Sequence, residues 1–388
     1  MHEEAVIISA VRTPIGKYGR AFRDVPAQRL GTIVVKSAIE KAGIDPIDVG
    51  EVIMGNVISA GLGQNPARQV AIHAGIPAET GAFTVNKVCG SGLKAVMLAA
   101  QAIRAGTADI VVAGGMENMS AAPHLLKGLR WGIKFGDLSV TDAMIYDGLW
   151  ELFNGYHMGV TGERVAEKYG VTRQEADEYS LMSHQRALAA TKSGAFTEEI
   201  TPVEAAGAMI SKDECIREDT TIEKLGTLSP VFKKDGVLTA GNSSQLSDGA
   251  AAIVVTSQKR AEGLGIRPLA RIVHSTVGGT LPADVMEAPI PTVRKLLRDK
   301  GFTIDDMDLI EYNEAYATSS IVVARELGID LRKFNVNGGA VGLGHPIGCS
   351  GARILVTLLH GLKERGLRRG LATLCMGGGN ALAMVVER

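Results

Sequence analysis

The sequence predicts an α/β fold made of two similar layered halves. Short runs rich in β-branched residues alternate with helical segments along the chain, which favours mostly parallel sheets covered by helices. The order strand, glycine-rich turn, helix, strand occurs twice, and such a repeat predicts a pseudo-twofold molecule. Composition agrees, because 388 residues with 46% hydrophobic residues, 47 glycines and only 4% aromatics suit a turn-rich protein with more than one core.

The first copy is expected to open with a strand at residues 5–9, followed by a Gly/Pro loop and a helix. Residues 83–86 then form a strand that leads into a glycine-rich turn. A helix follows over residues 93–105, and a strand over residues 108–113.

The second copy opens at residues 269–273 and follows the same order. Residues 334–337 are its expected strand before a glycine-rich turn, residues 352–365 its helix, and residues 371–376 its closing strand. Chance similarity between two strand–helix–strand units is the alternative interpretation.

The stretch between the copies fits neither and is interpreted as an inserted subdomain. It holds both tryptophans, a loop at residues 127–137, and a long helix that begins at a capping box, Thr172 to Glu175, and ends before Gly194. The expected units are therefore 1–120 with 247–268, the insertion 121–246, and 269–388. An insertion of this kind often carries substrate specificity, and a purely structural or oligomer-contacting role is the alternative.

Charge and hydropathy narrow the classes of function. A formal net charge of −1 lacks the basic field of a nucleic-acid binder, and the longest apolar runs have strand length, so no membrane partner is expected. Residues 1–5 lack the pattern of a signal peptide, which favours the cytoplasm. The 4 cysteines form no CxxC pair, so neither a disulfide framework nor a metal site is expected, and Cys215 and Cys349 are interpreted as small buried residues.

Two cysteines near opposite ends of the chain are candidate catalytic groups. Cys89 and Cys375 each follow a predicted buried strand and precede a glycine-rich turn. Cys89 also precedes the helix that starts near Leu93, where free amides and the helix dipole are expected to favour its thiolate form.

His345 and Asn313 are the companion candidates. His345 lies among glycines in a stretch expected to be neither helix nor strand, and compact turns of this kind bring backbone close to ligands. Asn313 follows an expected strand at residues 309–312 and precedes a helix, so a helix N-cap is an equally good interpretation.

Together these motifs resemble the four signature blocks of the thiolase family, in the family's order and spacing. The blocks are Asn-Lys-Val-Cys-Gly-Ser-Gly at 86–92, Asn-Glu-Ala at 313–315, the glycine-rich run 338–348 around His345, and Cys-Met-Gly-Gly-Gly at 375–379. The resemblance spans essentially the whole chain. It implies two βαβαβ-type halves stacked in five layers, with the insertion binding coenzyme A.

The resemblance also implies the roles of the catalytic residues. Cys89 is expected to be acylated and deacylated, His345 to activate it, and Cys375 to move a proton at the acyl α-carbon. One oxyanion hole is expected at His345 with a water held by Asn313, and another at the amides of Cys89 and Gly377. No metal or redox cofactor is implied, because coenzyme A thioesters are the substrates.

Contacts to coenzyme A and to the acyl group are likewise carried over from the family. The expected contact residues are His157, Met158, Arg217, Ser244, Met286, Ala315 and Tyr316. Arg217 is expected to face the nucleotide phosphates. Three departures from the family pattern concern binding: Lys224, Tyr316, and Glu287 in a stretch near the acyl pocket, where Glu287 is expected to point to solvent rather than into the pocket.

Residues 156–159, Tyr-His-Met-Gly, resemble the short-chain branch of the family. This implies acetyl transfer between two acetyl-CoA molecules, to give acetoacetyl-CoA and CoA, or the reverse cleavage. A broader 3-ketoacyl-CoA thiolase is the alternative, and a non-catalytic lipid-binding relative is a remote one. Thiolases are at least dimers, and a loop like 127–137 suggests a tetramer by analogy.

Overall fold

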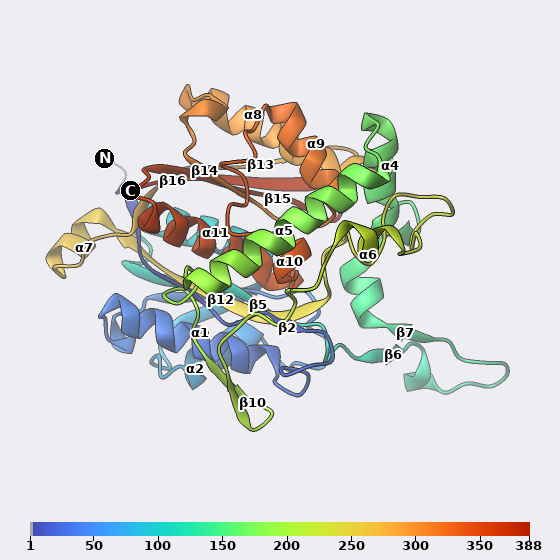
Figure 1. Cartoon of the computed structure of the whole chain (residues 1–388). Helices are drawn as coiled ribbons and strands as arrows, with labels where there is room; N and C mark the ends of the chain where they lie inside the picture. Colours follow the sequence, from blue (N-terminus) through green and yellow to red (C-terminus); the bar gives the residue numbers. More distant parts are fainter. Residues whose placement is uncertain (1–2) are drawn as a thin grey trace.

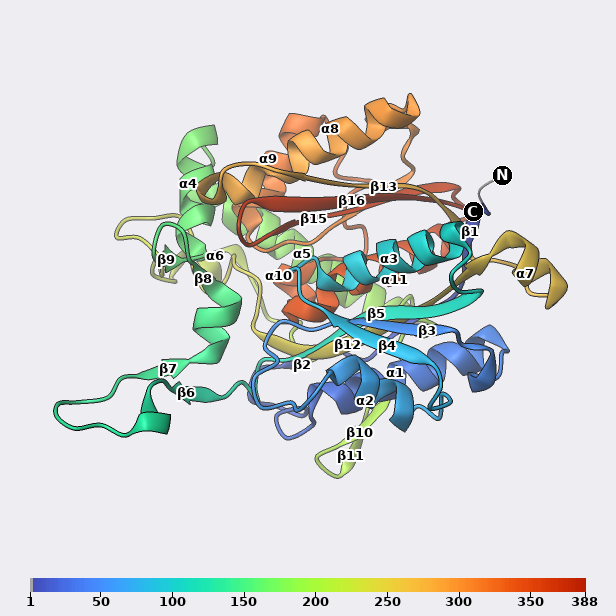
Figure 2. The same ribbon diagram turned by 180° about the vertical axis from the view of Figure 1, so that it is seen from behind.

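The computed structural model describes residues 3–388 and has five layers (Figures 1 and 2). Two outer helical layers enclose two sheets, and a pair of helices, α3 (Ser91–Ala105) and α11 (Ile347–Glu364), lies between the sheets. The predicted five-layered α/β fold with two similar halves is confirmed. The expectation for the N-terminus includes residues 1–2, which lie outside the described part.

The N-terminal half carries helices α1 (Ala27–Ala42) and α2 (Pro66–His73) on its outer face. Its strands are β1 (Ala5–Arg12), β3 (Glu51–Gly55), β4 (Gly81–Val85), β5 (Ile110–Asn118) and β12 (Ser247–Ser257). The C-terminal half carries α8 (Pro289–Lys300) and α9 (Ala317–Leu327) outside. Its strands are β13 (Ala270–Gly279), β14 (Leu309–Tyr312), β15 (Arg369–Met376) and β16 (Asn380–Glu387).

The sheets are mixed, so the expectation of mostly parallel sheets is wrong. Strand order is β14-β15-β16-β13-β1-β12-β5-β3-β4, and the two halves join where β1 pairs with β13. Only β14/β15, β3/β4 and β3/β5 are parallel among these pairs. The link from β15 to β16 is too short for a crossover, so β16 must return antiparallel. Strand β12, which enters after the long insertion, likewise runs antiparallel to β5 and β1.

Small residues let the two central helices pack closely. A Cβ on Gly92 would lie 2.7 Å from the backbone nitrogen of Ala352, and one on Gly351 would lie 2.6 Å from that of Leu93. The same layer holds a cluster of buried apolar side chains from both sheets, including Ile253 and Leu374. The helix that follows Cys89 is thus fixed against the helix that follows His345.

The glycine-rich region around His345 is more regular than expected. Gly342 lies in α10 (Ala340–Leu343), and α11 already begins at Ile347, so Gly348 and Gly351 are helical. These glycines serve close packing rather than turns: a Cβ on Gly348 would lie 2.8 Å from the carbonyl oxygen of Met116. Residues 334–337 were expected as a strand, but only a single bridge, Phe334 to Ile310, forms there.

The segment between β5 and β12 extends away from the layers as a hairpin, then packs on the C-terminal half through residues 159–193, while residues 203–210 lie against the N-terminal half (Figures 1 and 2). The capping box is confirmed at the start of α5 (Arg173–Ser193), where Thr172 accepts from the Glu175 amide. The segment between β5 and β12 contains β6 (His124–Leu126), β7 (Val140–Asp142), a π-helix (Met144–Leu149), β8 (Trp150–Glu151), β9 (Tyr156–His157), α4 (Gly159–Tyr169), α5, β10 (Val203–Ala205), β11 (Ala208–Ile210) and α6 (Ile222–Gly226). The proposed unit boundaries stay a prediction.

Among residues 3–388, no helix has both the length and the apolar character needed to span a bilayer.

Candidate active site

A small cavity of about 40 Å³ brings together four of the five predicted catalytic residues, from both halves of the chain; Asn313 does not line it but contacts His345. Cys89 comes from the first half, while His345, Cys375 and Gly377 come from the second. The expected contact residues Met158, Ser244, Met286, Ala315 and Tyr316 line the same cavity. The turns that precede the two central helices, one with Cys89 and the other with His345, are matching places of the two copies and meet at this cavity, while Cys375 comes from the closing strand of the second copy.

Cys89 sits on a strained turn between β4 and α3. The residue before it, Val88, has φ +49°, a left-handed conformation that is costly for a β-branched side chain. The turn is held by Ser91, whose Oγ accepts from Lys87 N at 2.8 Å and donates to Val88 O at 2.6 Å. These hydrogen bonds hold the strained turn in place, and Cys89 at this turn lines the cavity.

The surroundings of Cys89 act against the thiolate form that the helix N-terminus was expected to favour. Burial raises the pKa of Cys89 to about 12, and proximity to the Cys375 thiol adds to the rise in pKa. The backbone N–H groups of Gly377 and of Cys89 itself oppose this rise in pKa but do not overcome it. These two amides are the pair expected to form an oxyanion hole, and they face the Cys89 sulfur. Deprotonation of Cys89 therefore requires a nearby base.

Cys375 ends β15 and is buried, with 2% of its surface exposed. Its sulfur lies 3.9 Å from Tyr312 Oη and 3.9 Å from Met286 Sδ. Burial raises the pKa of Cys375 to about 11, which keeps it protonated near neutral pH. A protonated thiol in an apolar setting suits a group that donates or accepts one proton in the reaction.

The hydrogen bonds of His345 define its tautomer. Ser350 Oγ donates to Pro346 O at 2.9 Å and lies 2.5 Å from His345 Nδ1, so it must accept the Nδ1 hydrogen. Nε2 is then the acceptor nitrogen of a neutral imidazole. Burial lowers the pKa of His345 to about 3, and the positive charge of Arg353 lowers it further. His345 is thus a neutral base on the cavity wall.

Asn313 contacts His345 rather than capping a helix. Helix α9 begins at Ala317, with Tyr316 at the N-cap position, so the capping interpretation is wrong. The fully buried Asn313 places Nδ2 3.3 Å from His345 Nε2. Its Oδ1 has no hydrogen-bond partner among residues 3–388, which leaves an acceptor for a water molecule at this position.

Glu117 is a buried residue of the site that the sequence did not single out. Its carboxylate accepts from Gly348 N and Val57 N, each at 3.0 Å, and from Asn56 Nδ2 at 2.9 Å. It thereby ties the loop after β3 to the first turn of α11, next to His345. Burial raises the pKa of Glu117 to about 7, although the backbone amides oppose the rise in pKa. The only sequence signal was a carboxylate inside the apolar strand β5.

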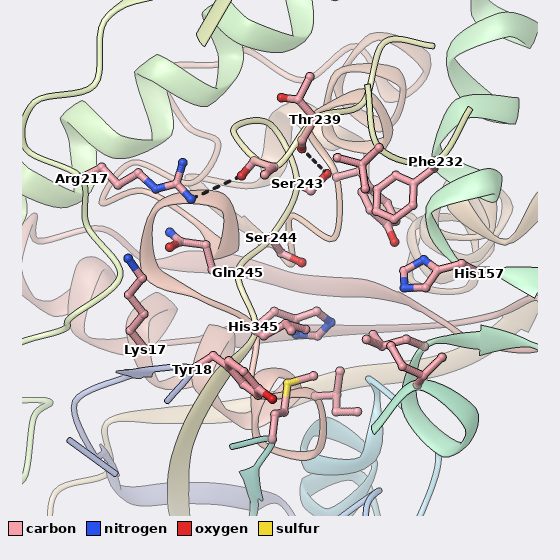
Figure 3. Close-up of a pocket in the computed structure, with 18 residues that line it drawn as sticks. Lys17, Tyr18, His157, Arg217, Phe232, Thr239, Ser243, Ser244, Gln245 and His345 are labelled. Atoms are coloured by element: carbon pink, nitrogen blue, oxygen red, sulfur yellow. Dashed lines mark hydrogen bonds between the residues drawn. The ribbon is translucent and has the colours of Figure 1, made fainter. Parts of the chain in front are cut away.

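A larger cavity of about 350 Å³ opens beside the small one (Figure 3). The two share Leu149, Ser244, Tyr316, His345 and Ile347, so they form one continuous space. The predicted residues His157 and Arg217 line the larger cavity. Figure 3 shows His345 at its base, with His157 and Phe232 on one side and Arg217 and Lys17 on the other.

Phe232 and Lys17 are lining residues that the sequence did not single out. The Phe232 ring stacks on His157 with centroids 4.8 Å apart and meets Tyr316 edge-on at 5.8 Å. This aromatic wall is apolar, while Lys17 and Arg217 supply positive charge on the other side. A long ligand with an apolar arm and an anionic end would match both sides.

The three residues that depart from the family pattern lie in different parts of the structure. Glu287 is absent from the lining of both cavities and pairs with Lys168 at 2.7 Å, so it points away from the acyl space although it is only partly exposed. Lys224 pairs with Asp219 at 2.6 Å on the surface. Tyr316 lines both cavities.

Comparison with family models matches residues 5–259 to the thiolase N-terminal domain and residues 266–388 to the thiolase C-terminal domain. The chain is 52% identical to an acetyl-CoA acetyltransferase of Escherichia coli, over 100% of this chain and 99% of that protein. It is 51% identical to an acetyl-CoA acetyltransferase of Cupriavidus necator, over 99% of each chain.

Solved structures agree with these matches. An acetyl-CoA acetyltransferase of Bacillus anthracis superposes with a TM-score of 0.97 at 43% identity, over 100% of this chain and 99% of that one. Human mitochondrial 3-ketoacyl-CoA thiolase in complex with CoA also gives a TM-score of 0.97, at 39% identity, over 99% of this chain and 98% of that one.

Proposed function

The chain belongs to the thiolase family, and from this premise we propose that it is an acetyl-CoA C-acetyltransferase. It acts on acyl-CoA and CoA, joining two acetyl-CoA molecules into acetoacetyl-CoA or cleaving acetoacetyl-CoA with CoA. The observation that carries the proposal is the shared cavity of Cys89, His345 and Cys375. The relatives from Escherichia coli and Cupriavidus necator, about 50% identical over the full length, are acetyl-CoA acetyltransferases, and this favours an acetyl group over a long acyl chain.

In the cleavage direction, Cys89 Sγ attacks the ketone carbon of acetoacetyl-CoA while its proton passes to His345 Nε2. The bond between the ketone carbon and the α-carbon breaks, and Cys375 protonates the α-carbon of the departing acetyl-CoA. CoA then attacks the acetyl group on Cys89 after losing its thiol proton to the Cys375 thiolate. Cys89 leaves as a thiol with the proton from His345, and condensation is the reverse.

Charge on the thioester and ketone oxygens is stabilised by the groups that face the cavity. The N–H groups of Cys89 and Gly377 supply one pair of donors, and His345 with a water on Asn313 supplies the other. Coenzyme A lies in the larger cavity, with its pantetheine arm along Phe232 and Tyr316 and its phosphates toward Lys17 and Arg217. The coenzyme is a substrate, and the reaction needs no further cofactor.

The first experiment compares initial rates of CoA-dependent cleavage of acetoacetyl-CoA and of 3-ketooctanoyl-CoA by the purified protein. Strong preference for acetoacetyl-CoA supports the proposal. Comparable or faster cleavage of the longer substrate assigns the chain to the broader 3-ketoacyl-CoA class. The variant Cys89→Ala, which keeps the fold but lacks the nucleophile, is the control for background cleavage.

We further propose a homo-oligomer that uses the hairpin at residues 121–143. Apolar side chains near its tip are strongly exposed, with Trp131 at 88% and Phe135 at 97%. Such a patch marks a contact with another molecule, and a second copy is the partner that family membership favours. Light scattering should give a smaller assembly for Trp131→Ser/Phe135→Ser than for the wild type, and an unchanged mass would contradict this.

A reducing compartment such as the cytoplasm suits this chemistry. The cysteines Cys89, Cys215, Cys349 and Cys375 are all free thiols, and the proposed reaction requires two of them.

A further inference from the structure

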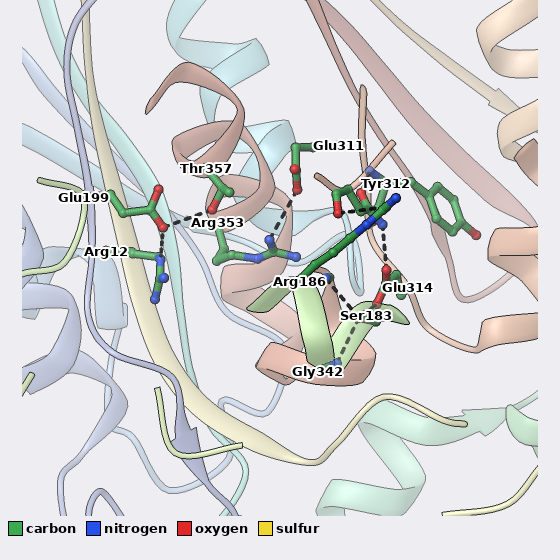
Figure 4. Close-up of polar contacts among 12 residues, drawn as sticks. Arg12, Ser183, Arg186, Glu199, Glu311, Tyr312, Glu314, Gly342, Arg353 and Thr357 are labelled. Carbon is green, nitrogen blue, oxygen red and sulfur yellow. Dashed lines mark hydrogen bonds and ion pairs between the residues drawn. The ribbon is translucent and has the colours of Figure 1, made fainter. Parts of the chain in front are cut away.

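Arg353 is a buried charge that the chemistry above does not use. It lies on α11, is 0% exposed, and none of its three guanidinium nitrogens has a hydrogen-bond partner among residues 3–388. The nearest carboxylate oxygen is Glu311 Oε2, 3.6 Å from Nη1 (Figure 4). That oxygen is buried and has no hydrogen-bond partner in the same part of the chain.

Arg12, the other fully buried arginine, has a full set of hydrogen-bond partners from the protein. Arg12 donates to Glu199 at 2.6 Å, to Asp213 at 2.7 and 3.0 Å, and to its neighbour's carbonyl at 3.1 Å. Arg353 has no comparable set. Unpartnered charged donors are costly to bury, and ordered water is their usual partner where protein groups are lacking.

Acceptors for such water lie on both sides of Arg353. Figure 4 places its guanidinium between Glu311 on one side and Glu199 with Thr357 on the other. Glu199 Oε1 accepts from Arg12 and Thr357, but its Oε2 has no partner among the described residues. Two carboxylates here disfavour a bound anion, so bridging water is the occupant that the charges favour.

The Arg353–Glu311 pair joins the strand that ends just before Asn313 to the helix that begins just after His345. Glu311 is on β14, two residues before Asn313, and Arg353 is on α11, one turn after Ser350. Ser350 in turn accepts from His345 Nδ1. The pair therefore bridges strand and helix directly behind the 3.3 Å contact of Asn313 Nδ2 with His345 Nε2.

We propose that Arg353 is a positioning residue: with Glu311 and buried water, it holds the start of α11 against the end of β14 and so fixes His345 relative to Asn313. It lines neither cavity and touches no reacting atom. A contribution to stability alone does not account for a buried Arg–Glu pair, because replacing such a pair with well-packed apolar side chains often costs no stability. This inference rests on the proposed function, since it concerns the rate of that reaction.

The test compares Arg353→Met, Glu311→Leu, the double variant and Arg353→Lys with the wild type. The control is Arg369→Met, which removes an arginine that is mostly buried and bonded to buried Glu387 at 3.1 Å, but at the opposite end of β15 from Cys375. For each protein, Tm, kcat and KM for CoA are measured in the cleavage of acetoacetyl-CoA. The rate of Cys89 alkylation by iodoacetamide is measured separately, because it needs no acyl substrate.

We expect both single variants to lower Tm and to lower kcat at least 10-fold, with KM for CoA within twofold of wild type. The double variant regains most of the lost Tm, because no orphan charge is left, but its kcat stays at least 10-fold low. Arg353→Lys, which keeps the charge, recovers part of kcat. Arg369→Met leaves kcat unchanged.

A double variant with wild-type kcat would overturn the inference, as would variants whose kcat simply follows Tm. If Arg353→Met does not fold, the double variant and Arg353→Lys still decide between these outcomes. Slower Cys89 alkylation in the folded variants is also expected, because it depends on His345. If the wild type fails to cleave acetoacetyl-CoA while alkylation still responds to Arg353, the proposed substrate fails and the positioning role stands.

Discussion

Gly377→Ala should lower kcat about 10- to 100-fold, because it disturbs the pair of amides that we propose as an oxyanion hole. Gly377 does not have a positive φ, so alanine adds no backbone strain there. Its Cβ would instead lie 3.2 Å from Val88 Cγ1, and one of the two segments must shift by a few tenths of an ångström. Val88 already has φ +49° and directly precedes Cys89, so it has little freedom to move.

The size of the expected fall in kcat follows from the displacement of one N–H donor. Complete loss of one oxyanion-hole donor costs about 10²–10³ in kcat. A displaced amide retains part of its interaction, so we expect about 1.4–2.7 kcal/mol in the barrier, the equivalent of 10- to 100-fold. Crowding of this kind also lowers the free energy of unfolding by about 1–3 kcal/mol.

The assay is the steady-state rate of acetoacetyl-CoA cleavage at saturating CoA, together with urea unfolding of the same preparations. Gly263→Ala is the matched control, because a Cβ there meets nothing within 4 Å and the residue lies in the surface helix α7 (Gln258–Gly263). A Gly377→Ala protein with kcat within twofold of wild type would refute the assignment of this amide to the oxyanion hole.

Three further results are expected. Cys89→Ala should form no acyl-enzyme by mass spectrometry, whereas Cys375→Ala should still be acylated but turn over about 10³-fold more slowly; an unacylated Cys375→Ala would overturn the two roles. The pKa of His345 is held near 3 in the folded state, below its unfolded value of about 6.5, so unfolding takes up a proton and stability falls as the pH drops below about 6.5. His345→Asn should reduce this slope, by up to about 1.4 kcal/mol per pH unit in urea titrations, and an unchanged slope would contradict a buried neutral imidazole. Arg217→Ala should raise KM for CoA about 2- to 10-fold with kcat unchanged, which steady-state kinetics would check; a fall in kcat alone would move Arg217 away from the nucleotide.

Local sequence signals predicted the elements whose patterns depend only on neighbouring residues. The capping box at Thr172 and the strand expected at residues 309–312 correspond to α5 and β14 as the structure has them. Where packing between distant segments decides, the same reasoning was wrong. Gly348 and Gly351 look like turn residues, yet they are helical because other segments, among them α3, press against them.

The sequence by itself determined which residues are proposed as the reacting groups. Cys89, His345 and Cys375 were identified from glycine-rich motifs, and their resemblance to a family supplied the order of chemical steps. Such motifs can be identified from the sequence, because a glycine before or after a reactive side chain reflects a local backbone requirement.

Only the tertiary structure decided the protonation and support of these residues. Burial, which no single segment controls, keeps Cys89 as a thiol and His345 as a neutral base, against the expectation from the helix dipole alone. The sequence alone could not assign a role to Glu117 or Arg353, because the partners of a charge within an apolar strand or helix lie more than 40 residues away in the chain. Desolvation and long-range pairing arise only in the packed chain, and they set the pKa values of the residues that the motifs identify.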